Sequence, residues 1–392
     1  MLEGVNVALG VTGSIAAVRA VELVHELRRE GAAVRGVVTE SARGIVHPWA
    51  VEFATDRPVV TEITGAVEHV ELCGRDGWAD VLLVAPATAN TVGKVAAAVD
   101  DTPVTTCATT ALGAEVPVVV APAMHEPMYD HPGVLSAIER LEGWGVDFVP
   151  PRVEEGKAKI ATDEAIATAV ARATGDDPLA GRHVVVTAGA TSEAIDPVRV
   201  LTNRASGRTG RAVARACHVL GADVTLVHGA VHDPPAAPYA AVERVESAEE
   251  MRDATLAAVA DADALVSAAA ISDFTVAARD EKIRSGEPLR LDLQPTPKLV
   301  DAVREADPDL PIVGFKAETG GDEAAMVEAA RELRDRVGMA FVVANDAAVM
   351  GGAETRAVLV GAGEETAPFE GSKAALGERV ARELAARLDG DG

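Results

Sequence analysis

Lysine is scarce in this chain. Only seven of the 36 basic residues are lysine, against 61 aspartates and glutamates, and the net charge is -25 over 392 residues. A molecule this negative repels polyanions, so we expect no nucleic-acid partner. The acidic residues form no long block, and carboxylates spread over a surface poor in lysine are typical of adaptation to a high-salt cytoplasm. We prefer this interpretation to an acidic interaction tail.

Cysteines and long apolar runs are also few. Cys73, Cys107 and Cys217 lie far apart without Cys-x-x-Cys spacing, which argues against a disulfide framework and a zinc site and predicts reduced thiols. The longest apolar stretches, such as 116–123, fall far short of the ~20 residues that span a bilayer, so no membrane partner is expected. The first basic residue is Arg19, so the positive start of a secretory signal is missing and a cytoplasmic location is predicted.

The composition is otherwise that of an ordinary globular protein. Hydrophobic residues make up 48%, with 35 Gly and 21 Pro, which excludes collagen and low-complexity disorder. At roughly 150 residues per domain, the length predicts two or three domains. Turn formers without apolar periodicity at 175–178 indicate a boundary. We therefore predict domains at 1–174 and 183–392, joined by a linker at 175–182.

The first domain opens with the pattern of a βαβ unit. Residues 5–11 read as a buried strand, followed by the turn at 12–14. A second apolar run at 34–39 follows at once. A helix is predicted between the two strands, with its apolar positions on one face and its end at Gly31: Ile15, Val18, Val21, Val24 and Leu27.

The second domain repeats this organisation without repeating the sequence. A strand is predicted at 183–189 and a helix at 210–220, and Gly221 precedes the next strand as Gly31 does in the first domain. Further strands are predicted at 81–85, 116–120, 264–268, 312–315, 341–343 and 357–360, and a terminal helix at 373–388. The fold class is therefore α/β, with two Rossmann-like open-sheet domains.

The turns after the strands are candidates for phosphate binding. Gly13-Ser14 lies where a strand is expected to lead into a helix, and free backbone N–H groups there attract an anion, although such turns often only reverse the chain. The dinucleotide fingerprint is absent, because 10–13 has the wrong glycine spacing and 189–191 lacks a second glycine. A nicotinamide-dependent enzyme is therefore disfavoured.

Other strand ends carry denser polar chemistry. Residues 85–91 place small hydroxyl and amide side chains at a helix start, where a mononucleotide phosphate would fit. Residues 121–129 form a constrained loop, either facing a ligand or packing its methionines into the core. In the second domain, the segments 187–193, 195–199 and 203–210 combine turn, anion-binding and helix-cap chemistry.

With these motifs the chain resembles a known family over essentially its whole length: the bifunctional phosphopantothenoylcysteine decarboxylase and phosphopantothenate cysteine ligase of coenzyme A biosynthesis, in an archaeal-like form. The first half carries Gly-Ser-Ile-Ala at Gly13, His-x-x-Leu at His69, Ala-Pro-Ala-Thr-Ala at Ala85 and Pro-Ala-Met-x-x-x-Met-Tyr at Pro122. The second half carries Asp-Pro-Val-Arg at Asp196, Asn-x-x-Ser-Gly at Asn203, Ala-Ala-Ala-x-x-Asp-Phe at Ala268, Lys-Ile-Arg at Lys282, Gly-Phe-Lys-Ala-Glu-Thr at Gly314 and Ala-Asn-Asp at Ala344. The resemblance implies a flavodoxin-like first domain.

For the second domain, the resemblance implies a ligase. CTP would activate the carboxylate of 4'-phosphopantothenate as an acyl-cytidylate, and cysteine's amine would then attack. Lys282 matches the lysine that contacts the nucleotide, and Asn203 the asparagine that holds the acyl-cytidylate. Mg²⁺, held mainly by the CTP phosphates, would offset the repulsion between the polyanionic reactants. The expected CTP pocket consists of Ser267, Ala268, Ala269, Asp273, Pro297, Lys298, Leu299, Val300 and Phe315, with Arg336 or Arg331 where relatives carry two further lysines.

For the first domain, the resemblance implies an FMN-dependent decarboxylase. FMN would oxidise the cysteine moiety of 4'-phosphopantothenoylcysteine, so that loss of CO₂ leaves a stabilised enethiolate. His69 matches the catalytic histidine, which can exchange a proton near neutral pH; an isolated histidine would more often have a structural role. The expected FMN-binding residues are Gly13, Ser14, Thr39, Ser41, Thr88, Ala89, Asn90, Thr91 and Met124.

The chain departs from the family pattern at two positions of the decarboxylase. His125 stands where an asparagine usually holds the substrate carboxylate. The flap cysteine that protonates the enethiolate in bacterial relatives has no counterpart, since Glu154 to Lys159 stand there instead. Lys157, Lys159 and His125 become the candidate proton donors, although the lysines could instead only bind the substrate phosphate.

Three alternatives remain open at this stage: a ligase whose flavin domain does not decarboxylate, a flavin-binding regulatory scaffold, and a two-domain dehydrogenase, which the missing fingerprint opposes. By analogy with the family, decarboxylase domains form trimers and ligase domains dimerise. The expected partners are therefore small-molecule substrates and further copies of the chain in a homo-oligomer, possibly a dodecamer.

Overall fold

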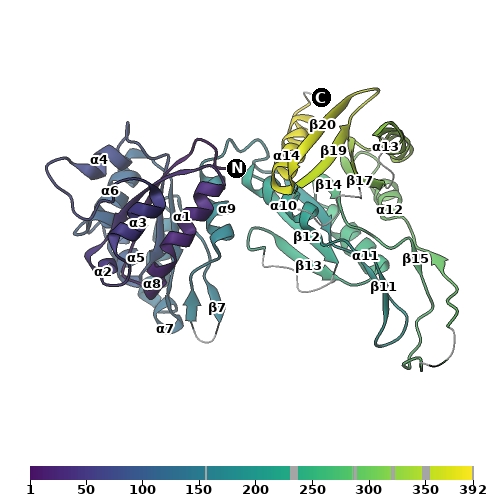
Figure 1. The fold of residues 1–392 in the computed structure, drawn as a ribbon, viewed down its shortest axis with the longest axis horizontal. Helices are drawn as coiled ribbons and strands as arrows, with labels where there is room; N and C mark the ends of the chain where they lie inside the picture. The colour runs from purple at the N-terminus through teal and green to yellow at the C-terminus, as the bar shows by residue number, and fades with distance from the viewer. Residues whose placement is uncertain are drawn as a thin grey trace. The chain divides into compact units, whose positions relative to one another are not determined.

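The computed structural model describes residues 1–154, 157–229, 237–284, 286, 289–318, 323–346 and 354–390. The chain divides into two compact units, Met1–Gly175 and Asp176–Gly392. Each unit contains its own sheet, wholly parallel in the first unit and mainly parallel in the second, and its own hydrophobic core (Figure 1). The predicted α/β class is confirmed.

The first unit is built on a five-stranded sheet in the order β2-β1-β3-β4-β6, with every pair of neighbours parallel. This is the strand order of flavodoxin-like folds, in which the order reverses between the first and third strands. All residues of β3 and β4 are buried, as expected for a parallel sheet covered on both faces. The strands are β1 Asn6–Val11, β2 Ala33–Val38, β3 Val81–Ala87, β4 Val118–Pro122 and β6 Val146–Phe148.

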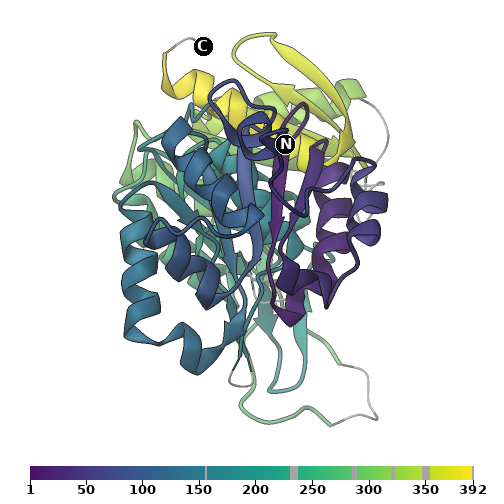
Figure 2. The same cartoon turned by 90° about the vertical axis from the view of Figure 1, so that its left-hand side faces the viewer.

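Helices cover both faces of this sheet (Figure 2). They are the 3₁₀ helix η1 Ile15–Arg19, α1 Ala20–Arg29, α2 Glu40–Arg43, α3 Pro48–Thr55, α4 Glu68–Cys73, α5 Ala89–Ala96, α6 Pro103–Ala114, α7 Glu126–Tyr129, α8 Pro132–Glu142 and α9 Asp163–Ala173. None of the helices in the described ranges has the length and apolar character needed to cross a bilayer.

The prediction of one continuous helix after β1 was wrong in its first turn. The segment begins as η1, and Ile15 and Val18 are 78% and 58% exposed. The α-helix starts only at Ala20, and its buried positions include Val24 and Leu27. The hydroxyl of Ser14 caps η1 through the amide of Ala16 and also donates to the carbonyl of Ala123. This tether to another strand end shapes the turn, and an apolar periodicity cannot reveal it.

A small antiparallel sheet accompanies the first unit. It has the order β5-β8-β7, with β5 Met124–His125, β7 Arg152–Glu154 and β8 Lys157–Lys159. Met124 pairs with Ala158, and His125 with Lys157. The strand β8, in the segment predicted to stand in place of the family's flap cysteine, is thus paired through its backbone with the loop that carries His125.

The second unit contains an eight-stranded sheet in the order β13-β12-β9-β14-β17-β18-β19-β20. The first six strands in this order are parallel, whereas β19 and β20 are antiparallel to their neighbours. The parallel part has the Rossmann order, which reverses between β9 and β14. The strands are β9 His183–Ala188, β12 Asp223–Gly229, β13 Ala241–Val245, β14 Ala264–Ser267, β17 Ile312–Glu318, β18 Phe341–Asp346, β19 Glu354–Val360 and β20 Thr366–Ser372.

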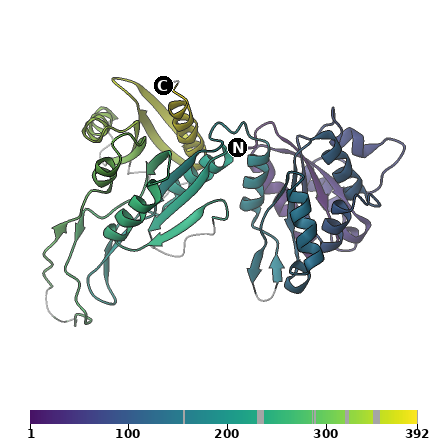
Figure 3. The same cartoon turned by 180° about the vertical axis from the view of Figure 1, so that it is seen from behind.

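The helices of this unit form two layers. The helices α10 Arg208–Val219 and α14 Lys373–Leu388 cover one face, and α11 Ala248–Val259, α12 Leu299–Ala306 and α13 Glu323–Val337 cover the other (Figures 1 and 3). Two short hairpin-like pairings project from the sheet: β10 Ser192–Ala194 with β11 Val200–Thr202, and β15 Phe274–Thr275 with β16 Gln294–Pro295.

All three cysteines are fully buried and free, in accord with the predicted reduced thiols. Burial raises the pKa of the Cys217 thiol to about 12. The pKa of Cys107 is raised first by a hydrogen bond with Cys73 and then by burial. Because the thiolate is the reactive form, these buried cysteines are unreactive parts of the core.

Candidate functional sites

The first candidate site lies where the strand order of the first unit reverses. The carboxyl ends of β1 and β3 meet there, and Thr12 joins them: its hydroxyl donates to the carbonyl of Pro86 at 2.7 Å and accepts from the amide of Thr88 at 3.2 Å. Thr12 is 1% exposed, so its single hydroxyl is used for this bridge. Open α/β sheets bind their ligands at this kind of position.

Small polar side chains line this edge, and three of them, Ser14, Thr39 and Thr88, cap helices. The buried Thr39 follows β2; its hydroxyl donates to the carbonyl of Val11 and caps α2 by accepting from the amide of Ala42. Its hydroxyl also lies 3.1 Å from that of Ser41. A Cβ at Gly13 would lie 2.5 Å from the Ser41 hydroxyl oxygen, so no larger residue fits there without displacing Ser41.

The same arrangement recurs after β3. The Thr88 hydroxyl accepts from the amide of Thr91, caps α5 and lies 3.0 Å from the Thr91 hydroxyl. Asn90 is exposed, and Ala89 is partly buried beside it. The structure therefore brings Gly13, Ser14, Thr39, Ser41 and Thr88–Thr91 to the carboxyl ends of three adjacent strands, where the first turns of helices present backbone N–H groups.

His69 lies at the start of α4, and its Nδ1 is buried without a hydrogen-bond partner. The preceding residue holds the loop in front of it, because the carboxylate of Glu68 accepts from both the amide and the hydroxyl of Thr64. These bonds lower the pKa of Glu68. A buried ring nitrogen left without a partner costs free energy, which is consistent with a group whose partner is a ligand.

The loop after β4 places Met124 and His125 next to the flap strand β8. Met124 is partly buried and His125 is exposed. The backbone register sets His125 opposite Lys157, and Arg152 opposite Lys159. The three candidate proton donors are thus brought into one small sheet.

The second candidate site lies at the reversal of strand order in the second unit, between β9 and β14. Two threonine hydroxyls hold the chain that leaves β14: Thr187 accepts from the amide of Ala269 at 3.2 Å, and Thr191 from that of Ser272 at 2.8 Å. The Asn203 side chain donates to the carbonyl of Ala270 at 2.9 Å from an exposed position. Asn203 therefore lies beside the predicted nucleotide-binding backbone.

Asp196 organises the loop that carries Lys282. Its carboxylate is 3% exposed and accepts from the amides of Val198, Arg199 and Ile283, and it pairs with the Arg199 guanidinium at 2.5 Å. Burial raises the pKa of Asp196, but these hydrogen bonds and the Arg199 charge outweigh it and leave the pKa lowered. Arg199 also donates to the carbonyl of Ile283. The neighbouring Lys282 is exposed, so its backbone is held while its side chain faces solvent.

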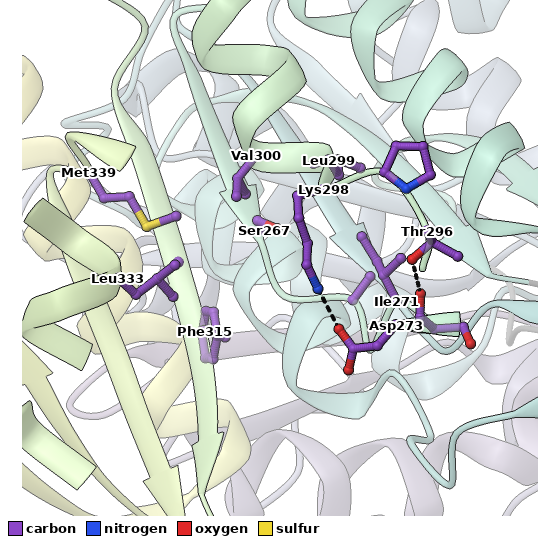
Figure 4. Close-up of a pocket in the computed structure, with 14 residues that line it drawn as sticks. Ser267, Ile271, Asp273, Thr296, Lys298, Leu299, Val300, Phe315, Leu333 and Met339 are labelled. Carbon is purple, nitrogen blue, oxygen red and sulfur yellow. Dashed lines mark hydrogen bonds and ion pairs between the residues drawn. The ribbon is translucent and has the colours of Figure 1, made fainter. Parts of the chain in front are cut away.

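A pocket opens between β14, β17 and the helices α12 and α13 (Figure 4). At its mouth the Lys298 ammonium lies 2.5 Å from the Asp273 carboxylate, and the Thr296 hydroxyl donates to the carbonyl of Ser272. Both charged side chains are more than half exposed. An exposed pair contributes at most about 1 kcal/mol, so a ligand can replace either partner at little cost. The lining includes eight of the predicted residues: Ser267, Ala269, Asp273, Pro297, Lys298, Leu299, Val300 and Phe315.

Ala268, Lys282 and Arg336 were predicted to bind the nucleotide but do not line this pocket. Ala268 lies in the strand end behind it, with its amide bonded to the carbonyl of Thr187. Arg336 lies on α13 and pairs with Asp301 of α12 at 2.7 Å, and Lys282 lies in its own loop. Arg331 pairs with Glu328 on the same helix. The family's motif residue Thr319 lies outside the described residues.

His228 was not predicted from the sequence, yet it supports the same edge. It is 2% exposed at the end of β12; its Nδ1 bonds to the carbonyl of Gly229, and its Nε2 lies 3.0 Å from the Arg211 guanidinium. Added Cβ atoms at Gly189 and Gly207 would lie 2.9 Å from its Cε1 and 2.8 Å from its Nε2. Both glycines have positive φ, so two turns are folded tightly over this imidazole.

No cluster of three or more histidine, cysteine or carboxylate side chains that could hold a metal ion occurs among the described residues.

Comparisons with known proteins cover both units. Residues 1–175 match the family described as Flavoprotein, and residues 179–388 match the DNA/pantothenate metabolism flavoprotein C-terminal domain. The Coenzyme A biosynthesis bifunctional protein CoaBC of Thermococcus kodakarensis is 50% identical over 364 residues, which cover 92% of this chain and 90% of the relative. Proteins of the same name from Methanocaldococcus jannaschii and Bacillus subtilis are 34% and 35% identical, over 98% and 92% of this chain and 94% and 91% of theirs. The chain therefore belongs to the family of bifunctional coenzyme A biosynthesis proteins.

Proposed function

We propose that this protein catalyses two successive steps of coenzyme A biosynthesis. The second unit ligates cysteine to 4'-phosphopantothenate with CTP, and the first unit decarboxylates the resulting 4'-phosphopantothenoylcysteine to 4'-phosphopantetheine. The observation that carries this proposal is the 50% identity to a bifunctional relative over 92% of the chain. The two polar sites, one at each reversal of strand order, support it.

For the ligase, the pocket beside β14 and β17 would hold the nucleotide, with Asp273 and Lys298 at its mouth. Asn203 would hold the acyl-cytidylate, because its side-chain amide donates a hydrogen bond to the carbonyl of Ala270 at the edge of that pocket. Lys282 would approach the phosphates from a backbone that Asp196 and Arg199 fix in place. Mg²⁺ would arrive on the CTP phosphates and offset the charge of a strongly acidic protein.

For the decarboxylase, FMN fits the cradle made by Gly13, Ser14, Ser41 and the caps Thr39 and Thr88. Ser14, Thr39 and Thr88 have hydroxyls at helix starts, which suit a phosphate, and a side chain at Gly13 would displace Ser41. When bound, FMN supplies the two-electron chemistry that the cysteine moiety undergoes. Thr91, Ala89, Asn90 and Met124 border the same edge and complete the proposed cofactor site.

His69 and His125 would handle the substrate's protons and carboxylate. The Nδ1 of His69 is buried without a protein partner, so a substrate group could bond to it without breaking an existing contact. His125 is exposed beside the flap strand, where an imidazolium could pair with a carboxylate.

We also propose that the protein acts as a homo-oligomer. The first unit exposes large apolar side chains that a monomer would leave in water: Ile15 is 78% exposed, Trp49 77% and Phe53 83%. Exposed apolar groups of this size mark association surfaces when they are contiguous. Trimers of the first unit and dimers of the second would give a dodecamer. Sedimentation equilibrium of the whole chain tests this, and a monomer at micromolar concentration would contradict it.

One incubation tests the proposed reactions. Purified protein reconstituted with FMN is mixed with 4'-phosphopantothenate, cysteine, CTP and Mg²⁺, and the products are followed by mass spectrometry. We expect CMP, pyrophosphate, CO₂ and 4'-phosphopantetheine. A product that stops at the cysteine amide would leave the ligase alone active, and the absence of both products would overturn the proposal. A parallel reaction with ATP in place of CTP measures the nucleotide preference.

A further inference from the structure

One buried histidine of the second unit lies under the turns that lead to the ligase site. Val227 belongs to the core beneath α11 and α12, so the next side chain of β12, His228, points to the opposite face of the sheet, which α10 covers. A Cβ added at Gly189, just after β9, or at Gly207, just before α10, would clash with the imidazole. A titratable ring this deeply buried needs a partner at each nitrogen.

The partners of the two ring nitrogens fix the position of the proton. Nδ1 lies 2.8 Å from the carbonyl oxygen of Gly229, which can only accept, so Nδ1 carries the hydrogen. Nε2 lies 3.0 Å from Nη1 of Arg211, which can only donate, so Nε2 is the unprotonated acceptor. The contacts therefore select one neutral tautomer of His228.

The same guanidinium nitrogen holds the segment before α10. Nη1 of Arg211 carries two hydrogens, and it also donates to the carbonyl oxygen of Ser206 at 3.0 Å. Residues 203–206 have no regular secondary structure, so side-chain bonds help to set their path. Asn203 bonds to the strand-end backbone at the start of this segment, and Arg211 bonds to Ser206 at its end. His228 therefore acts on the segment that carries Asn203 through one arginine.

Protonation of His228 would break this series of bonds. An imidazolium has a hydrogen on both nitrogens, so its Nε2 would face the donating Nη1 of Arg211 with a second donor and a like charge. In the described part of the chain, the charged groups that act on His228 are Arg211 on α10 and Arg244 on the neighbouring strand β13. On the β9 side the paired residue is the uncharged Ala188. Burial and the two arginine charges lower the pKa of the ring, and the bond to Gly229 opposes them.

We propose that His228 is a positioning residue of the ligase: its neutral ring holds Arg211, and Arg211 holds the segment from which Asn203 reaches the acyl-cytidylate. This inference rests on the proposed function. None of the residues in this series of bonds lines the nucleotide pocket beside β14 and β17. Loss of the acceptor at Nε2 should therefore slow turnover of the acyl-cytidylate more than it weakens CTP binding. Because an imidazolium cannot accept from Arg211, ligation should slow below pH 6.5 as His228 gains its proton.

The pH dependence of ligation tests this assignment. Pyrophosphate release by the whole FMN-loaded protein is measured at saturating substrates from about pH 4.5 to about pH 8. In His228→Gln, an amide oxygen can accept from Arg211 as Nε2 does, but the side chain cannot gain a charge. We expect this variant to work within about threefold of the parent rate near pH 7.5, and the ratio of its rate to the parent's to rise about threefold toward the acid end. The substrates titrate alike with both proteins, so this ratio isolates His228.

Two further variants remove the bond itself. His228→Leu lacks the acceptor and should lower kcat about 10-fold at every pH, with the KM for CTP within about twofold of the parent value. Arg211→Met should lower kcat at least as much, and the double variant should lose no more than Arg211→Met alone, because the two residues act through one bond. His218→Gln is the matched control, since it removes another imidazole from the last turn of α10 and should keep the parent's pH profile.

The outcomes separate this inference from the function on which it rests. An acid decline in His228→Gln that matches the parent's would overturn the inference. A His228→Gln protein that keeps the parent's melting temperature but is inactive at every pH would also overturn it, as would additive losses in the double variant. A parent without ligase activity would instead contradict the proposed function.

Discussion

Asn203 and Lys282 are both assigned to the proposed ligase reaction, but their local surroundings differ. Asn203 bonds to the Ala270 carbonyl beside the pocket, whereas Lys282 extends from a tethered loop. We expect Asn203→Ala to leave CTP affinity within about twofold and to slow turnover of the acyl-cytidylate about 100-fold, because a donor that acts on an intermediate affects the rate more than binding. Lys282→Gln should instead slow formation of the acyl-cytidylate. Calorimetry with CTP measures the affinity, and rapid-quench analysis of the acyl-cytidylate measures the two rates. If both variants lost CTP affinity equally and showed no other defect, these two role assignments would be wrong.

His228 should make the second unit sensitive to acid. Burial lowers its pKa below the ordinary 6.5, and the positive charges of Arg211 and Arg244 act in the same direction, although the bond to Gly229 opposes them. Below pH 6.5 the unfolded chain then binds more protons than the native one, so stability falls as pH decreases. We expect the melting temperature of the parent to drop more steeply between pH 7 and pH 5 than that of His228→Gln. Parallel curves for the two proteins would contradict this.

The sequence predicts the residues proposed to contact substrates better than it predicts the residues that fix those residues in position. Ser14, Thr88 and Asp273 stand in recognisable motifs at strand ends. Thr12 and His228 bond to partners distant in the chain, at Pro86 and Arg211. A hydroxyl that bridges two strands leaves no local periodicity, and it becomes visible only when the strand order is known.

The flap strand β8 and its partner β5 decide which group could protonate the decarboxylated product. Their register sets His125 opposite Lys157 and places Lys159 two residues further along β8. If a lysine is the acid, Lys157→Ala or Lys159→Ala should release CO₂ at the parent rate in the first turnover and form 4'-phosphopantetheine at least about 100-fold more slowly. Rapid quench with labelled substrate measures both products.

A lysine that only binds phosphate would give a different result, because its variant should recover at high substrate concentration. His125→Asn introduces the residue usual at this position of the family and is the third variant in the rapid-quench experiment. If only this variant separates CO₂ release from product formation, His125 is the acid.

The central strands and the edge strand β2 were predictable as elements, whereas the edge strands β6, β13 and β20 were not. The strands β3 and β18 are apolar runs that a parallel sheet buries on both faces. The edge strand β13 exposes four of its five residues, and β20 is partly buried only at alternate positions. Such strands lack an apolar run because one side of their backbone has no neighbour, so their sequence resembles a loop. The terminal helix, in contrast, was predicted with both of its ends, since its apolar period is unbroken and Ser372 caps it.

The charge of the whole molecule should make its stability depend on salt. At -25, self-repulsion opposes the compact state in dilute buffer, where the Debye length is about 30 Å at 0.01 M and falls to about 3 Å at 1 M. We expect the melting temperature to rise steeply from 10 mM to 1 M KCl, by about 2–4 °C for each ~1 kcal/mol gained. NaCl at equal concentration should act alike if screening is the cause. A flat profile would remove the high-salt interpretation.

The burial of every native thiol has a practical consequence for measuring this two-unit chain. Cys73, Cys107 and Cys217 are fully buried, and the raised pKa values of Cys107 and Cys217 keep those two protonated at neutral pH. A cysteine introduced at an exposed position would therefore be the single reactive site for a maleimide dye, without removal of any native residue. Paired labels, one on each unit, would then report by energy transfer how the flavin-binding and ligase units move during turnover.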